Sequence, residues 1–150
     1  MVARRTTGLV AGIVLLVEAV GFVVVHGVLA TAVGGQRMSM ADLDPDAMVA
    51  GTWAMGGAMG LFLALCGAAL LVVAVRDRPP GRAARVLLIA CAVTHGVLGA
   101  LAVGLVGWGA FAFMMVVLGL VVLSLLAYAP DVIAREAAEP RPPANGPAPV

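Results

Sequence analysis

The sequence predicts an all-α integral membrane protein, with four transmembrane helices in an up-down bundle. The first observation is the composition: 63% of the 150 residues are hydrophobic and 11% are charged, whereas soluble domains are roughly half apolar and a quarter charged. The second is the length of the apolar runs, which are long enough to cross a bilayer. The third is the placement of arginine, which gathers in the segments that four such helices would put on one side of the membrane.

The first predicted span covers residues 8–33 and follows the pair Arg4-Arg5. A signal peptide is the alternative for such a start, but its apolar region is about 7–15 residues long. This run is longer and contains Glu18. At a rise of ~1.5 Å per residue the helix measures ~39 Å, which exceeds the ~30 Å hydrocarbon core. We therefore expect a retained helix that tilts or protrudes.

The second predicted span covers residues 47–75 and follows an acidic polar connection. Asp44-Pro45 is a typical helix start, with Asp as the N-cap and Pro at the first helical position. Within the span, Gly56-x-x-x-Gly60 predicts the close approach of another helix. An arginine-rich stretch with two prolines and a glycine then ends the helix and turns the chain.

Residues 86–129 contain no charged residue. They are too many for one span and enough for two, with a glycine cluster at 104–109 as the turn, so we predict spans at 86–106 and 108–129. In the third span small residues recur at every fourth position, which predicts a smooth groove for a neighbouring helix. The groove residues are Gly96, Ala100 and Gly104.

The end of the chain divides into two parts. Residues 1–139 are predicted to form the transmembrane domain, in which residues 131–139 continue the fourth span as a short amphipathic helix. Residues 140–150 are rich in proline and alanine. Such a segment cannot bury a core, so we predict a disordered cytoplasmic tail.

The arginines predict the orientation. Eight of the nine lie at the N-terminus, in the turn between the second and third spans, or in the C-terminal segment. An even number of spans brings these three segments to one side, which the positive-inside rule makes cytoplasmic. Trp53 and Trp108 then fall at the outer ends of their spans, where interfacial aromatic residues gather. We expect a multi-pass protein of the cell membrane with both termini in the cytoplasm.

Glu18 lies near the middle of the first span, where a carboxylate is costly. An acid at this depth is either a proton or cation site or a neutral group that ties two helices together, and the sequence leaves both open. Glu18 and His95 each lie one residue from the apolar centre of their spans, so we predict a hydrogen bond or ion pair between them. His26 lies ~12 Å nearer the outside, whereas Cys66 in the second span is at a similar middle depth.

Two kinds of metal site are considered. His26 and His95 lie on different helices, as bis-imidazole haem ligation requires. Methionine thioethers suit Cu(I), and Met-x-Met followed by Met-x-x-x-Met near the top of a span resembles elements of the Ctr copper transporters. These methionines are Met38, Met40, Met55 and Met59. The chain departs from that family in having four predicted spans and no long Met-rich tail. The alternative for all these residues is helix packing, so no cofactor is predicted and haem or copper stays an alternative.

Three hypotheses for the function remain. A net charge of +1 without a clustered basic face argues against nucleic-acid binding, and no nucleophile–base arrangement predicts an enzyme. The first hypothesis is a non-enzymatic accessory or self-associating module, whose partners are the lipid bilayer and a membrane protein or a second copy. The second is a small proton- or metal-coupled transporter using Glu18 and His95. The third is a redox membrane protein that binds haem or copper.

Overall fold

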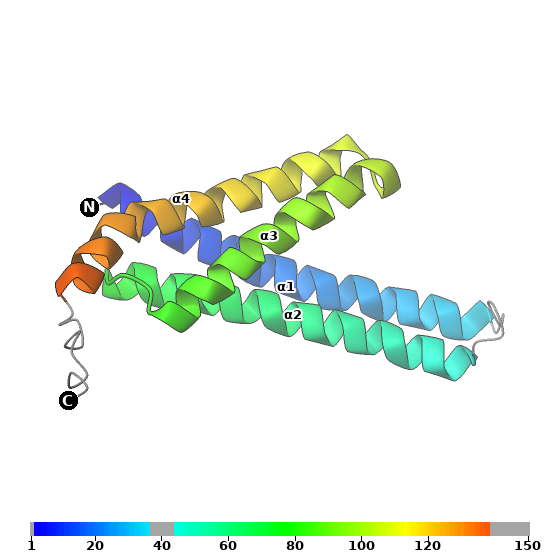
Figure 1. Ribbon diagram of the computed structural model, residues 1–150. Coiled ribbons are helices and arrows are strands. Elements are labelled where there is room, and N and C mark those ends of the chain that lie inside the picture. Colours follow the sequence, from blue (N-terminus) through cyan, green and yellow to red (C-terminus); the bar gives the residue numbers. More distant parts are fainter. Residues whose placement is uncertain (1, 37–43, 139–150) are drawn as a thin grey trace, which may run out of the picture.

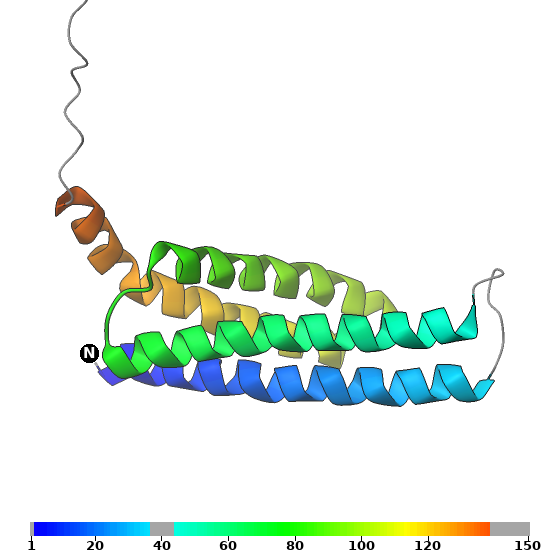
Figure 2. The ribbon, with the colours of Figure 1, turned by 90° about the horizontal axis from the view of Figure 1, so that it is seen from below.

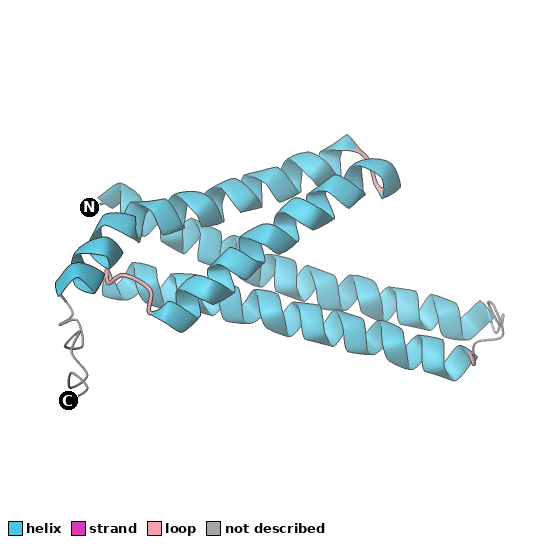
Figure 3. Cartoon of the chain, in the orientation of Figure 1, coloured by secondary structure: helices cyan, strands magenta, loops and turns pink. Residues whose placement is uncertain are grey.

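The computed structural model describes residues 2–36 and 44–138 and shows four helices without strands in these ranges (Figures 1 and 3). All four are long and apolar enough to cross a membrane. The helices are α1 (Val2–Gln36), α2 (Pro45–Arg76), α3 (Arg82–Leu105) and α4 (Trp108–Ala138). The predicted tail at 140–150 and most of the acidic connection lie outside the described residues.

All four helices reach beyond the apolar spans that the sequence predicts, α2 by only one or two residues at each end. Because arginine is a good helix former, α1 begins before the Arg4-Arg5 pair and α3 begins at Arg82. At the other end of the chain, α4 runs on to Ala138 with Pro130 inside it. Residues 131–138 therefore belong to α4, and Figure 2 shows this last stretch running in a different direction, as expected where a proline removes a helix hydrogen bond.

The predicted start of α2 is confirmed. The Asp44 carboxylate accepts a hydrogen bond from the backbone N–H of Asp46 at 2.9 Å, and Pro45 is the first residue of the helix. This cap pairs one of the N–H groups that a helix start leaves unsatisfied. At the other end, Asp77 caps α2 in the left-handed conformation, with φ of 48°.

Helices α1 and α2 form a long antiparallel hairpin that glycines hold close together (Figure 1). A Cβ atom on Gly60 would lie 2.5 Å from Val23, and one on Gly56 would overlap His26. Toward the start of α1 the same closeness recurs, because a Cβ on Gly67 would lie 2.9 Å from the carbonyl oxygen of Gly12. The close approach predicted from Gly56-x-x-x-Gly60 is confirmed, and its partner is α1.

Helices α3 and α4 form the second hairpin, joined by a tight turn at Gly107, whose φ of 116° favours glycine. The predicted glycine-cluster turn is therefore present. The predicted groove on α3 does not face α4, because a Cβ on Gly96 or Gly104 would meet nothing within 4 Å. The close contact with α4 is made at Gly99, where a Cβ would lie 2.6 Å from Met115. Small residues at every fourth position show that a face is smooth, but they do not show which face meets the neighbour.

The two hairpins cross near the end that holds the N-terminus and the α2–α3 turn, and they diverge toward their other ends (Figure 1). The core lies at this crossing and draws on all four helices. Its buried residues include Ala11, Leu15, Leu63, Cys66, Leu70, Leu88, Cys91, Val117 and Val121. Large apolar side chains elsewhere face outward, such as Val28 and Leu105. So much exposed apolar surface indicates a membrane protein.

Candidate functional site

Glu18 on α1 and His95 on α3 meet in the interior of the protein. The Nε2 atom of His95 lies 3.0 Å from the Oε2 atom of Glu18. The His95 side chain is 1% exposed and the Glu18 side chain is 8% exposed. The predicted contact is therefore present, and it joins the first hairpin to the second. The contact could be predicted from the depth of each residue in its apolar helix, because a polar side chain inside a membrane needs a polar partner at the same depth.

The second ring nitrogen of His95 determines how protons are arranged in the pair. Nδ1 lies 2.8 Å from the carbonyl oxygen of Cys91, one turn earlier in α3. A carbonyl oxygen can only accept, so Nδ1 carries a hydrogen. The contact between Nε2 and Glu18 then holds one proton, either on the carboxyl group of a neutral pair or on the imidazolium of an ion pair. The same geometry accommodates both forms.

Two cysteines extend this polar contact toward α2. The sulfur of Cys91 lies 3.6 Å from Nδ1 of His95, and the thiol of Cys66 donates to the carbonyl oxygen of Leu87 at 3.8 Å. Leu87 lies one turn before Cys91 in α3, so the Cys66 thiol meets α3 on the face that carries Cys91. Both are fully buried and free. Three helices thus contribute to one row of polar groups, and among the described residues no buried side-chain nitrogen or oxygen lacks a partner.

Cys66 was predicted from the sequence as a secondary site residue, whereas Cys91 was not. The signal was available, because Cys91 precedes His95 by four residues and side chains at that spacing share a helix face. Free cysteines in apolar helices are common packing residues. Because Cys91 was interpreted as such a packing residue, its contact with His95 was not predicted.

His26 lies apart from this row, in the part of α1 that packs against the first half of α2. Its Nδ1 donates to the carbonyl oxygen of Phe22 at 2.9 Å, its ring stacks on the Phe22 ring at 4.6 Å, and its Cβ packs against Gly56. His95, in contrast, has both ring nitrogens engaged. Haem ligation by both histidines would require His95 to give up one of these hydrogen bonds.

The four methionines considered as soft-metal ligands are brought together only in part. Of these four, Met55 lines a pocket of about 470 Å³ together with Met48 and with His26, a histidine that the methionine pattern does not include. Met59 is partly buried against the core instead. Met38 and Met40 lie outside the described residues. Within the described ranges no group of three or more His, Cys, Asp or Glu side chains is arranged to hold a metal.

A charged cluster that was not predicted from the sequence lies at the end of the molecule where the hairpins cross. The Arg4 guanidinium lies 2.8 Å from Asp77 and 2.6 Å from Asp131, and it covers the ring of Tyr128 at 4.4 Å. Its hydrogen bonds hold the pKa of the Asp77 carboxyl group below its usual value. Arg4 therefore fastens α1 to the end of α2 and to α4.

The fold and this site define a class: all-helical membrane proteins with a buried acid–imidazole pair between two hairpins. Comparison of the chain with protein-family models, with curated proteins and with solved structures finds no match. The contacts of the described residues are therefore the basis for a proposed function.

Proposed function

We propose that this is a small proton-coupled membrane transport protein in which Glu18 and His95 bind and release one proton. The observation that carries the proposal is the 3.0 Å contact between Nε2 of His95 and Oε2 of Glu18, with Nδ1 committed to a backbone carbonyl. This arrangement leaves Nε2 and the carboxylate as the two places for a single proton. Ionisable groups at such depth in membrane proteins commonly mark proton or ion pathways.

The chemistry of proton release follows from the same contact. With the proton present, one of the two atoms donates and the other accepts, so the hydrogen bond holds α1 against α3. When the proton leaves, a carboxylate oxygen faces the lone pair of Nε2, and neither atom can donate. The contact then becomes repulsive in a medium of low dielectric constant. Loss of the proton thereby favours separation of the two hairpins at this level, which gives a transport protein two states to alternate between.

The proposal includes the placement of the helices in the membrane. The four helices cross the cell membrane in up-down order, with both termini in the cytoplasm. Arg4 contacts Asp77 and Asp131, which supports one common end for the N-terminus, the α2–α3 turn and the last part of α4. Eight of the nine arginines lie in these segments or close to them in the sequence. The positive-inside rule assigns such an end to the cytoplasm.

A second candidate is a non-enzymatic accessory module that associates with itself or with another membrane protein. The observation that favours it is the smooth face of α3, where a Cβ on Gly96 or Gly104 would meet nothing within 4 Å and Ala100 is exposed. Small residues on a lipid-facing surface permit another helix to approach closely. In this role the Glu18–His95 pair only fastens the hairpins together.

Proton flux in proteoliposomes distinguishes the two candidates. Purified protein is reconstituted with a pH-sensitive dye inside the vesicles, and an imposed membrane potential drives protons. We expect a flux above that of protein-free vesicles, falling to background in Glu18→Gln, whose amide keeps a hydrogen bond to Nε2 but cannot supply the proton. Ser124→Ala is the matched control, since Ser124 is also buried within a helix but bonds only to Leu120 of its own helix.

The contrary outcomes are equally defined. Proton transport is contradicted if vesicles with the wild-type protein conduct no more protons than empty vesicles. The accessory module is supported if, in addition, a crosslinker traps dimers of the wild-type protein but not of Gly96→Leu. Equal flux in the wild-type protein and Glu18→Gln contradicts the assignment of the proton to this pair. Size-exclusion chromatography of each variant verifies that folding is retained.

A further inference from the structure

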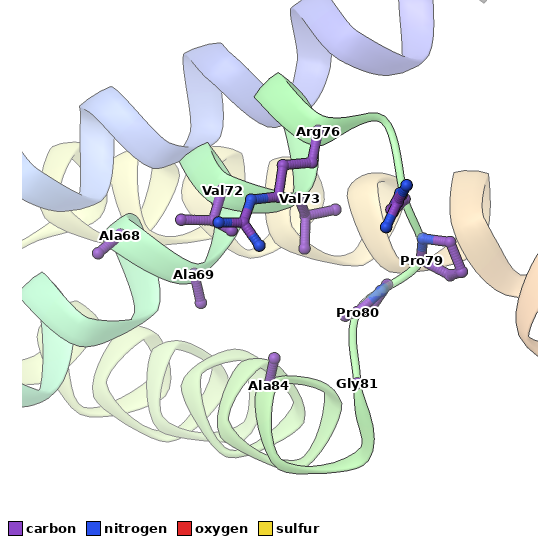
Figure 4. A pocket seen from close by; sticks show the side chains of 10 residues that line it. Ala68, Ala69, Val72, Val73, Arg76, Pro79, Pro80, Gly81 and Ala84 are labelled. Atoms are coloured by element: carbon purple, nitrogen blue, oxygen red, sulfur yellow. The ribbon is translucent and has the colours of Figure 1, made fainter.

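A pocket lies between the end of α2 and the start of α3, away from the Glu18–His95 pair (Figure 4). Its volume is about 410 Å³, within the ~300–1,000 Å³ that is typical of ligand pockets. Figure 4 shows side chains from α2 on one side, the turn with its prolines at the end, and Ala84 of α3 on the other side. The lining residues are Ala68, Ala69, Val72, Val73, Arg76, Arg78, Pro79, Pro80, Gly81 and Ala84.

The pocket is apolar at depth and positively charged at its mouth. Arg76 is the last residue of α2 and Arg78 lies in the turn, whereas Ala68 lies eight residues earlier in α2. At ~1.5 Å per residue the floor therefore extends ~12 Å from the arginines along the helix. In a membrane this places the arginines at the headgroup level and the alanine and valine floor in the hydrocarbon.

The two arginines are available to a ligand. Both are exposed, and no hydrogen bond or ion pair within the described ranges engages Arg76 or Arg78. The acid between them in the sequence, Asp77, is held by Arg4 at 2.8 Å. No acidic residue lines the pocket. The Arg4–Asp77 contact thus engages the acid that adjoins both arginines in the sequence. Among the side chains that the structure describes, no acid pairs with Arg76 or Arg78, and both lie above an apolar floor.

We propose that this pocket binds an anionic phospholipid, with its phosphate at Arg76 and Arg78 and an acyl chain along the apolar floor. Charge complementarity selects the anionic headgroup, since guanidinium groups bind phosphate oxygens in bidentate geometry. The apolar floor selects a lipid over a free phosphate. Basic pockets between membrane helices at the headgroup level are suited to such ligands. The site rests on the helices crossing a membrane, and it is independent of whether Glu18 and His95 transfer a proton.

Native mass spectrometry of the full-length protein in detergent tests the proposal. The protein is titrated with phosphatidylglycerol and, separately, with phosphatidylcholine of the same acyl chains. We expect phosphatidylglycerol to bind more tightly, and Arg76→Gln or Arg78→Gln to weaken its binding about fivefold each. Arg5→Gln is the matched control, because it removes one exposed arginine from the same end without touching the pocket.

The apolar part of the pocket has its own variants. Ala69→Phe fills the floor and keeps both arginines, so we expect weaker phosphatidylglycerol binding, whereas Ala58→Phe on the exposed surface of α2 leaves binding unchanged. Glycerol phosphate, which lacks acyl chains, is expected not to displace the lipid. Equal binding of the two lipids, an equal loss in Arg5→Gln and Arg76→Gln, or displacement by glycerol phosphate overturns the proposal.

Discussion

Glu18 and His95 lie 77 residues apart in the sequence, yet the Oε2 atom of the first is 3.0 Å from the Nε2 atom of the second. They belong to different hairpins, so this hydrogen bond spans the crossing on which the core is built. His95 is also bound through Nδ1 to its own helix. Its ring is therefore fixed in orientation, and Glu18 meets a defined nitrogen.

Removing the acid without replacing its hydrogen bond should destabilise the protein. Glu18→Ala leaves Nε2 of His95 buried and unpartnered, which costs about 1–3 kcal/mol. Glu18→Gln keeps a donor for Nε2 and should lose less. The measurement is the unfolding midpoint in detergent, followed by circular dichroism. Equal midpoints for the wild-type protein and Glu18→Ala would show that the buried contact contributes nothing to stability.

The glycine contact between α1 and α2 gives a matched pair of substitutions. Gly56→Ala places a methyl group against His26 and should destabilise the hairpin by about 1–3 kcal/mol. Gly57→Ala adds the same methyl group where nothing lies within 4 Å. It should be neutral or slightly stabilising, because alanine favours helix. Thermal unfolding of both variants in one detergent measures the difference, and equal midpoints contradict the close packing.

The Arg4–Asp77 contact predicts how stability depends on pH. Because Arg4 holds the pKa of Asp77 below its usual value of ~3.9, the folded protein gains stability from the ionised carboxylate above that value. This stability is lost as the pH falls from about 4 through the lowered pKa of the folded state. Asp77→Asn should unfold at a lower temperature than the wild-type protein at pH 6, and the gap should narrow as the pH falls below 4. A gap that stays constant with pH contradicts this origin.

The buried cysteines predict slow thiol chemistry. Cys66 and Cys91 are both fully buried, so a membrane-permeant maleimide should not label the folded protein and should label both residues after denaturation in detergent. Mass spectrometry counts the adducts. Rapid labelling of Cys91 in the folded protein would show that the row of polar groups beside His95 is open to small molecules.

Two kinds of feature could be predicted from the sequence: those set within a single helix, and those set by how deep a residue lies in its membrane span. The lengths of the apolar runs predicted four helices, and Asp44 with Pro45 predicted the start of α2. The equal depth of Glu18 and His95 in their spans predicted that the two side chains meet. The features that depend on how two hairpins cross were not predictable from those rules. The contact of Arg4 with Asp77 and Asp131 joins three segments at one end, and nothing local to any of them shows it.

The same limit applies to helix faces and to ligand groups. A four-residue pattern pointed to Gly96, while Gly99 makes the close contact with α4, because a smooth face can equally be left to lipid or to another protein. Likewise, the methionine pattern could not show that His26 would line the same pocket as Met48 and Met55. Such groupings depend on the rotation of each helix about its axis, which composition and spacing do not determine.

Nitrogen-15 NMR of His95 in lipid nanodiscs tests the central claim most directly, together with the carbon-13 signal of the Glu18 carboxyl group. The chain has two histidines, so the His26→Gln variant assigns the spectrum. We predict that Nδ1 of His95 keeps its hydrogen at every pH, and that the Nε2 and carboxyl signals change together in one step as a single proton leaves. Independent titration of the two signals, or loss of the hydrogen from Nδ1, would contradict a proton shared by Glu18 and His95.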